Sequence, residues 1–175
     1  MIELRPLTGV DVDAHNAGED DEVVRWLSGQ PATHDSTRRH FAMLADNASR
    51  ATGKRGFGVW LEGKLAGYID FDPGADDLPA AGDVNISYAI HPWARQRGVA
   101  TSAVLLLCDY LAGMNIGKRA IIRAQPLNTA SVRVAERSGF RFLAEISSTH
   151  DYHPDGSAVI YATYALDFRD DVSAC

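Results

Sequence analysis

The chain has few cysteines, no long apolar run and no excess of positive charge, and each absence excludes a class of protein. Only Cys108 and Cys175 occur among its 175 residues, which excludes a disulfide framework and a cysteine-rich metal site. No apolar run approaches the roughly 20 residues that cross a membrane, and the first residues lack the apolar core of a signal peptide. We therefore expect a cytoplasmic protein that is not membrane-bound and holds no metal.

The charge balance is acidic, with 17 Lys and Arg against 23 Asp and Glu and a formal net charge of −6. Binding to nucleic acid without sequence preference needs basic patches, so we expect no nucleic-acid partner. A positively charged substrate suits this balance, although many enzymes are acidic simply for solubility. The length and the 46% hydrophobic content predict one domain over residues 1–175. The oligomeric state stays open, with a homodimer as one option.

The hydrophobic pattern predicts an α/β chain in the order strand, helices, three strands, helix, strand, helix and two strands. The expected strands are residues 2–7, 57–61, 65–71, 84–90, 118–125, 140–148 and 158–167. The expected helices are 10–17 (a short helix or a turn), one through Val23 and Leu27, 36–49, one from Ala100 and 129–138. The Pro/Gly-rich loop 72–82 is either a mobile flap or a surface insertion.

The strand over residues 84–90 has one apolar and one polar face. Val84, Ile86, Tyr88 and Ile90 alternate with Asn85, Ser87, Ala89 and His91, so the apolar set is expected in the core and the polar set beside a site. We interpret His91 as a turn residue before Pro92 and not as a catalyst.

After Pro92 the chain passes through a turn with one glycine into a long apolar helix. A helix start presents about four unpaired N–H groups and roughly half a positive charge, which suits a phosphate. Arg95 and Arg97 add two full charges. The alternative is an ordinary strand-to-helix turn with solvated arginines. A dinucleotide-binding G-x-G-x-x-G motif is absent, because Gly98 is the only glycine between Pro92 and Gly113.

A second segment, Gln125-Pro-Leu-Asn128-Thr-Ala-Ser131-Val-Arg-Val-Ala-Glu-Arg-Ser-Gly139-Phe140, follows about 25 residues later. Together with Arg95-Gln-Arg-Gly-Val-Ala100 it resembles the GNAT superfamily of acetyl-CoA-dependent N-acetyltransferases. The likeness is specific over residues 83–145 and strongest to the branch that acetylates the N-terminal alanine or serine of ribosomal proteins. It implies a mixed sheet of about seven strands with splayed central parallel strands, flanked by about four helices.

The resemblance also implies how acetyl-CoA binds. The strand 84–90 would splay from 118–125, and its unpaired backbone groups would bond the amides of the pantetheine arm. The expected contacts with acetyl-CoA are Ala89, Ile90, Arg95, Gln96, Arg97, Gly98, Val99, Ala100 and Asn128.

The catalytic groups depart from the commonest pattern of this superfamily. Many members place a tyrosine where this chain has Ala135, and several carry a glutamate base where it has Asn85. Members with a serine one turn earlier suggest Ser131 as the proton donor to sulfur; alternatively Ser131 only starts its helix. The candidate bases are Glu19, Asp20, Asp72, His150 and Asp151.

We assign Glu19 and Asp20 to the catalytic site together with Ser131. The alternative for both acids is favourable charge at a helix start.

The acceptor is expected to be a primary amine that attacks the thioester directly, without an acyl-enzyme. At pH 7 a lysine amine is neutral in about one molecule in two thousand and an α-amine in about one in seven, so a base matters far more for lysine. A protein N-terminus, a polyamine, an amino acid and an aminoglycoside or other amine antibiotic all stay open. The alternative function is an inactive GNAT-fold module that holds acyl-CoA for regulation or assembly.

Overall fold

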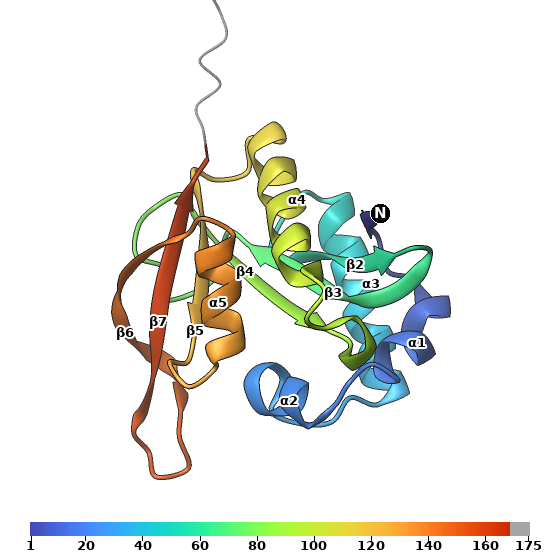
Figure 1. Cartoon of the computed structure of the whole chain (residues 1–175), viewed down its shortest axis with the longest axis horizontal. Helices are drawn as coiled ribbons and strands as arrows, with labels where there is room; N and C mark the ends of the chain where they lie inside the picture. Colours follow the sequence, from blue (N-terminus) through green and yellow to red (C-terminus); the bar gives the residue numbers. More distant parts are fainter. Residues whose placement is uncertain (169–175) are drawn as a thin grey trace, which may run out of the picture.

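The computed structural model describes residues 1–168, in which a seven-stranded mixed sheet carries helices on both faces (Figure 1). The strands are β1 (Ile2–Arg5), β2 (Arg55–Leu61), β3 (Lys64–Asp72), β4 (Asp83–Ile90), β5 (Arg119–Ala124), β6 (Arg141–Tyr152) and β7 (Ala158–Asp167). The helices are α1 (Val12–Asn16), α2 (Asp21–Val23), α3 (His34–Ser49), α4 (Val99–Gly113) and α5 (Thr129–Arg137). The α/β class and the order of elements predicted from the sequence are confirmed. Within residues 1–168 no helix is long and apolar enough to span a bilayer.

The strand order is β1-β2-β3-β4-β5-β7-β6, and β4 and β5 form the parallel pair at its centre. Their pairing runs from Asp83 opposite Arg119 to Ile86 opposite Ile122 and then stops. β4 continues to Ile90 with only β3 beside it, while β5 continues along β7. The central parallel strands are therefore splayed, as expected.

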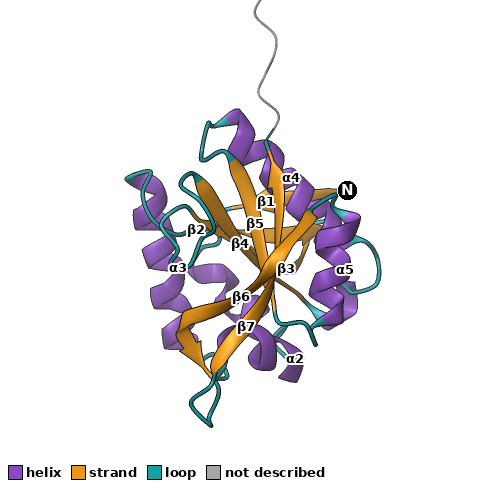
Figure 2. Ribbon diagram, turned by 90° about the vertical axis from the view of Figure 1, so that its left-hand side faces the viewer, coloured by secondary structure: helices purple, strands orange, loops and turns teal. Residues whose placement is uncertain are grey.

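The larger core lies between the sheet and the helices α4 and α5, and α1 and α3 cover the opposite face (Figure 2). The apolar positions predicted for β4 point into this core, where Val84, Ile86 and Ile90 are buried and Tyr88 packs at the edge. The outer face of β4 presents Asn85, which is buried as well. The period-two pattern of this strand thus predicted its inward face correctly.

A smaller core, formed by Leu7, Val12, Phe41, Leu44, Leu65 and Tyr68, joins α1 and α3 to the sheet. His15 lies edge-on against Phe41 and Tyr68, with ring centroids 5.2 and 5.8 Å away. Burial, reinforced by the charges that His91 and His40 carry when protonated, lowers the pKa of His15 to about 4. Burial also lowers the pKa values of His40 and His91. This core therefore holds three neutral histidines at pH 7.

We predict that these histidines make the fold acid-sensitive. In the unfolded chain His15 takes up a proton as the pH falls below about 6.5, whereas in the folded chain it does so only near pH 4. The free energy of unfolding that neutral His15 contributes above pH 6.5 is therefore lost as the pH falls from 6.5 to 4. His15 alone contributes at most about 3 kcal/mol to this loss. His15→Phe keeps an edge-on ring without a proton to gain, and should flatten the fall of Tm between pH 6.5 and 4. His153→Phe, at an exposed position of the β6–β7 hairpin, is the control. An unchanged slope in His15→Phe would place the acid sensitivity elsewhere.

Candidate active site

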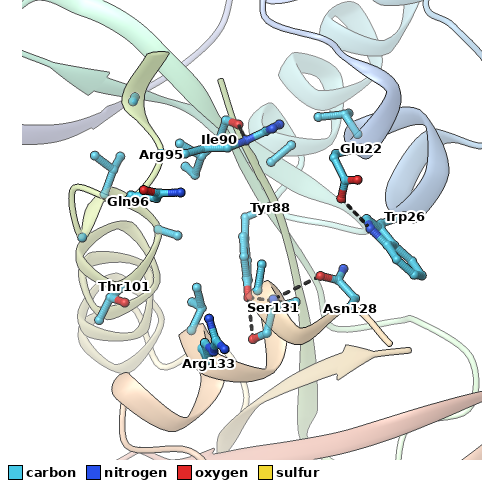
Figure 3. A pocket seen from close by; sticks show the side chains of 18 of the residues that line it. Glu22, Trp26, Tyr88, Ile90, Arg95, Gln96, Thr101, Asn128, Ser131 and Arg133 are labelled. Atoms are coloured by element: carbon cyan, nitrogen blue, oxygen red, sulfur yellow. Dashed lines mark hydrogen bonds between the residues drawn. The ribbon is translucent and has the colours of Figure 1, made fainter. Parts of the chain in front are cut away.

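A cleft of about 390 Å³ opens where β4 leaves β5, between α2, α4 and α5 (Figure 3). Its volume falls within the range of about 300–1,000 Å³ that is usual for ligand sites. We call it the large cleft. It is lined by Glu22, Val23, Trp26, Leu27, Tyr88, Ala89, Ile90, Ala94, Arg95, Gln96, Gly98, Val99, Ala100, Thr101, Asn128, Ala130, Ser131, Arg133, Val134 and Arg137.

Most of the site residues predicted from the sequence meet in this cleft. Every residue expected to contact acetyl-CoA lines it except Arg97, and Ser131 lines it too. Glu19 and Asp20 do not. The structure thus gathers three separate stretches of sequence, from β4, the α4 turn and the start of α5, around one space.

The turn before α4 is shaped by two residues with left-handed backbone. Gln96 has φ 59°, and Gly98 has φ 73° at the N-cap of α4. A Cβ on Gly98 would meet nothing within 4 Å, so the backbone angle, and not crowding, favours glycine. Ser102 donates its N–H to the carbonyl of Gly98 at 3.0 Å. The earlier N–H groups of α4 have no helical acceptor and lie at the wall of the large cleft, where they suit an anion.

The side chain of Arg95 is held by an acid and does not extend freely into the cleft. Its Nη1 and Nη2 donate to the two carboxylate oxygens of Asp20 at 2.6 and 2.8 Å, and its Nε donates to the carbonyl of Ile90 at 2.8 Å. Asp20 also caps α2 by accepting from the N–H of Val23 at 3.2 Å. The Arg95 hydrogen bonds lower the pKa of Asp20. Asp20 therefore fastens α2 to the α4 turn.

This geometry gives each of the two acids a structural contact, and their assignment to catalysis stays a prediction. Asp20 is a weakened proton acceptor because Arg95 stabilises its charge, and Glu19 accepts from the N–H of Ala32 at 2.7 Å. Their alternative role, the ordering of a helix start and its neighbouring loop, matches what the structure shows. Of the other candidate bases, neither Asp72, His150 nor Asp151 lines a described cavity of the site.

Two basic residues that the sequence analysis did not single out lie on α5. Arg133 and Arg137 are exposed, stand one turn apart and line the large cleft. Neither forms an ion pair with any residue of the described range 1–168. Glu22 is the only carboxylate among the lining residues, and its Oε2 accepts from Trp26 Nε1 at 2.9 Å (Figure 3). The cleft wall thus carries a net positive charge.

Tyr88 reaches from β4 to α5 and contacts Ser131. Its hydroxyl lies 2.9 Å from Ser131 Oγ and 3.3 Å from the Ser131 carbonyl (Figure 3). Asn128 caps α5 by accepting from the N–H of Ser131 at 3.2 Å, which fixes this first turn. Burial raises the pKa of Tyr88 to about 12, so its phenol stays protonated at neutral pH. The sequence placed Tyr88 on the inward face but did not reveal this contact.

Ala135 stands where many relatives have a tyrosine, and here it is fully buried in the larger core. Cys108 is buried too, and burial raises the pKa of its thiol to about 12, so the thiol stays protonated at neutral pH. Cys175 lies outside the described residues.

The loop 72–82 is tied to β6, because Asp77 accepts hydrogen bonds from Thr149 and Ser148. This anchoring fits a surface insertion better than a free flap.

A second cavity of about 70 Å³, the small cavity, adjoins the large cleft in the gap between β4 and β5. It is lined by Trp26, Leu27, Ile86, Ser87, Tyr88, Ile122, Arg123, Ala124, Gln125, Asn128, Ser131 and Tyr161. Five of these residues also line the large cleft, namely Trp26, Leu27, Tyr88, Asn128 and Ser131. The hydroxyls of Tyr88 and Ser131 therefore belong to a wall that the two spaces share.

Among the solved structures with a similar fold are several acetyltransferases. The acetyltransferase from Salmonella typhimurium that modifies the N-terminal serine of ribosomal protein L7/L12 is 20% identical, with a TM-score of 0.79 over 96% of this chain and 95% of its own. Aminoglycoside acetyltransferase AAC(6')-Ib, in complex with coenzyme A, is 17% identical with a TM-score of 0.76, and 95% of each chain is covered.

A third similar structure is the microcin C7 self-immunity acetyltransferase MccE in complex with acetyl-CoA and AMP. It is 13% identical with a TM-score of 0.78, over 95% of this chain and 92% of its own. At these identities the likeness concerns the fold. A search of curated proteins found no match.

The sequence itself matches the profile of the acetyltransferase (GNAT) domain over residues 2–141. That stretch contains β1 to β5, α1 to α5 and every residue that lines either cavity except Tyr161, which lines only the small cavity. The match covers most of the chain and all of the large cleft. The protein belongs to the GNAT acetyltransferase family.

Proposed function

We propose that this protein transfers an acetyl group directly from acetyl-CoA to a primary amine. One observation carries the proposal: the hydroxyls of Ser131 and Tyr88 lie in the wall that separates a large, positively lined cleft from a small cavity. Such an arrangement suits two substrates that meet at one point. The similar structures of AAC(6')-Ib and MccE, which contain coenzyme A and acetyl-CoA, support acetyl-CoA as the donor.

The large cleft fits the chemical groups of acetyl-CoA. Its unpaired N–H groups at the start of α4, with Arg133 and Arg137 on α5, suit the phosphates. The edge of β4 beyond Ile86 has backbone groups with no strand partner, which suit the amides of the pantetheine arm. When bound, acetyl-CoA supplies the acetyl group as an activated thioester.

Ser131 is the proposed proton donor to the sulfur that leaves. Its hydroxyl can give a proton to sulfur while Tyr88, protonated at neutral pH, gives a hydrogen bond to Ser131 Oγ. The nucleophile is the lone pair of the neutral amine, and the C–N bond forms as the C–S bond breaks. The sulfur takes the hydroxyl proton of Ser131, and the proton that the amine nitrogen loses restores this hydroxyl through water, so the products are the amide and the CoA thiol. The hydroxyl pair thus acts where negative charge develops on the leaving group.

The small cavity contains no carboxylate or imidazole among the residues that line it. An amine that arrives mostly as ammonium would need such a base, whereas an α-amine is neutral in about one molecule in seven at pH 7. We therefore favour α-amines over lysine side chains as acceptors. The two similar enzymes named for an N-terminal serine and an aminoglycoside show that this fold serves both protein and small-molecule amines.

A direct test measures CoA release from acetyl-CoA with a panel of primary amines, alongside calorimetric binding of acetyl-CoA. Saturable binding with amine-dependent CoA release supports the proposal. Saturable binding without release for any amine, including peptides with free N-termini, would identify an acyl-CoA-binding module instead. No binding of acetyl-CoA would refute both.

We predict that Arg133 and Arg137 contribute to acetyl-CoA affinity through exposed charge. The double variant Arg133→Ala, Arg137→Ala should weaken acetyl-CoA binding by about three- to tenfold at low salt, and less at high salt, because exposed charges are screened. The measurement is a calorimetric titration at two ionic strengths. The matched control, Arg38→Ala with Arg39→Ala, removes two exposed charges from α3 on the other face of the sheet and should change nothing. Equal affinity in both double variants would remove the α5 arginines from the site.

We predict that Ser131→Ala lowers kcat by roughly ten- to a hundredfold and leaves acetyl-CoA affinity nearly unchanged. The hydroxyl acts on charge that appears only in the transition state, and sulfur is a weak hydrogen-bond acceptor, so the loss falls near the lower end for general acid catalysis. Tyr88→Phe should give part of the same loss, and the double variant should lose less than the two effects multiplied. Steady-state kinetics and calorimetry together check this. A normal kcat in Ser131→Ala would mean that the thiolate leaves unaided, and a loss of affinity alone would make Ser131 a positioning residue.

A further inference from the structure

Arg123 is placed at the point where the two central strands separate. It is the first residue of β5 after the parallel pairing with β4 ends at Ile122, and its side chain lines the small cavity. The same face of the sheet carries Asn85 and Tyr161, both of which contact Arg123. A half-buried guanidinium therefore lies beside the wall that contains Ser131.

The contacts of Arg123 hold its guanidinium in place without neutralising it. Its Nε donates to Asn85 Oδ1 and its Nη1 donates to the carbonyl of Asp76, each at 3.2 Å. The guanidinium carbon lies 5.5 Å from the centre of the Tyr161 ring. Nη2 makes no hydrogen bond to any residue from 1 to 168. An arginine has five N–H donors, so this one keeps several donors available.

Two other half-buried arginines, Arg95 in the turn before α4 and Arg119 on β5, differ in this respect, whereas Arg55, buried on β2, also forms no ion pair within residues 1–168. Arg95 and Arg119 each form an ion pair with a carboxylate, at 2.6 Å in both cases. Arg123 forms none within the described chain. A positive charge that is partly removed from water and unpaired favours an oxygen ligand.

The acids around Arg123 are engaged by other groups. Asp77 accepts from Thr149 and Ser148, and Asp151 accepts from Tyr161 Oη at 3.0 Å and from Ser148 at 3.2 Å. The carboxylate of Asp76 lies 3.6 Å from the ring of His150, and only its backbone carbonyl contacts Arg123. None of these aspartates forms an ion pair with Arg123, which lines the small cavity.

We propose that Arg123 binds an oxygen of the carboxylate or carbonyl group attached to the carbon that bears the reacting amine, so that the acceptor is an α-aminoacyl compound. This inference rests on the proposed acetyl transfer and specifies its second substrate. The oxygen belongs either to the carboxylate of a free amino acid or to the first carbonyl of a peptide. A cavity of about 70 Å³ has room for this end of an acceptor only, so its side chain or following residues would extend past the rim.

The proposal separates acceptors that otherwise share a primary amine. Polyamines and aminoglycosides carry further ammonium groups and no carbonyl beside the amine, so Arg123 repels them. A free α-amino acid and a peptide N-terminus both present the required oxygen. The charge of Arg123 thus selects among acceptors, whereas Ser131 and Tyr88 act on the thioester.

The test uses trios of acceptors that differ only beside the amine: alanine, alaninamide and ethylamine, and phenylalanine, phenylalaninamide and 2-phenylethylamine. We divide each kcat/KM by the fraction of that amine that is neutral at the assay pH, which removes the effect of amine basicity. In the wild-type protein we expect this corrected kcat/KM of the preferred carbonyl-bearing member to exceed that of the plain amine by about 10- to 100-fold, as for a charged hydrogen bond. Arg123→Gln should bring this ratio close to one without changing the Kd of acetyl-CoA. Arg141→Gln, which removes an exposed charge paired with Asp167, is the matched control and should keep the wild-type ratio.

The results with the different acceptors identify the source of the oxygen. They also separate the role of Arg123 from the proposed acetyl transfer. A preference for the free acid indicates an amino-acid carboxylate, and equal use of the amide indicates a peptide carbonyl. Plain amines that react as well as both, or a ratio that survives in Arg123→Gln, would overturn the role of Arg123 while leaving acetyl transfer intact. If no amine is acetylated, thermal shifts in the presence of CoA decide. A rise in Tm with alanine or alaninamide but not with ethylamine, absent in Arg123→Gln, supports the site. A wild-type Tm that neither alanine nor alaninamide raises refutes it.

Discussion

The end of the parallel pairing at Ile86 and Ile122 is the constraint on which the site depends. Beyond this point β4 pairs with β3 and β5 pairs with β7, so the sheet divides into two halves. Backbone groups left without a strand partner need water or a ligand, since burying them unpaired is costly. The divergence is therefore stable only as an open cleft, and it lets Tyr88 cross to α5 and Arg123 turn toward Asn85.

Local signals in the sequence were sufficient for the elements and for the turn before α4. The alternation along β4 predicted the burial of Val84, Ile86 and Ile90, and the glycine before an apolar helix predicted an open helix start. These features depend on the spacing of a few neighbouring residues, which periodicity and turn chemistry describe well. Most of the residues expected to contact acetyl-CoA, which these features predicted, line one cleft.

The contacts that define the chemistry join residues far apart in the sequence, so local patterns could not reveal them. Asp20 meets Arg95 across 75 positions, Tyr88 meets Ser131 across 43, and Arg123 meets Asn85 across 38. The Tyr88 and Arg123 contacts depend on sheet register and on the divergence of β4 from β5, and the Asp20–Arg95 contact depends on how α2 lies against the turn before α4. An acid before a helix suits either a catalytic or a capping role, and the partner that favours the capping role for Asp20 comes from another part of the chain.

The arrangement of charge links the two halves of the site. Arg133 and Arg137 line the space assigned to the donor, Arg123 lines the space assigned to the acceptor, and the neutral hydroxyls of Tyr88 and Ser131 stand between them. A cation near an amine disfavours its ammonium form. If Arg123 binds the neighbouring oxygen, the same charge lowers the pKa of the bound amine. A cavity that neither a carboxylate nor an imidazole lines would thus favour the neutral amine through its cation.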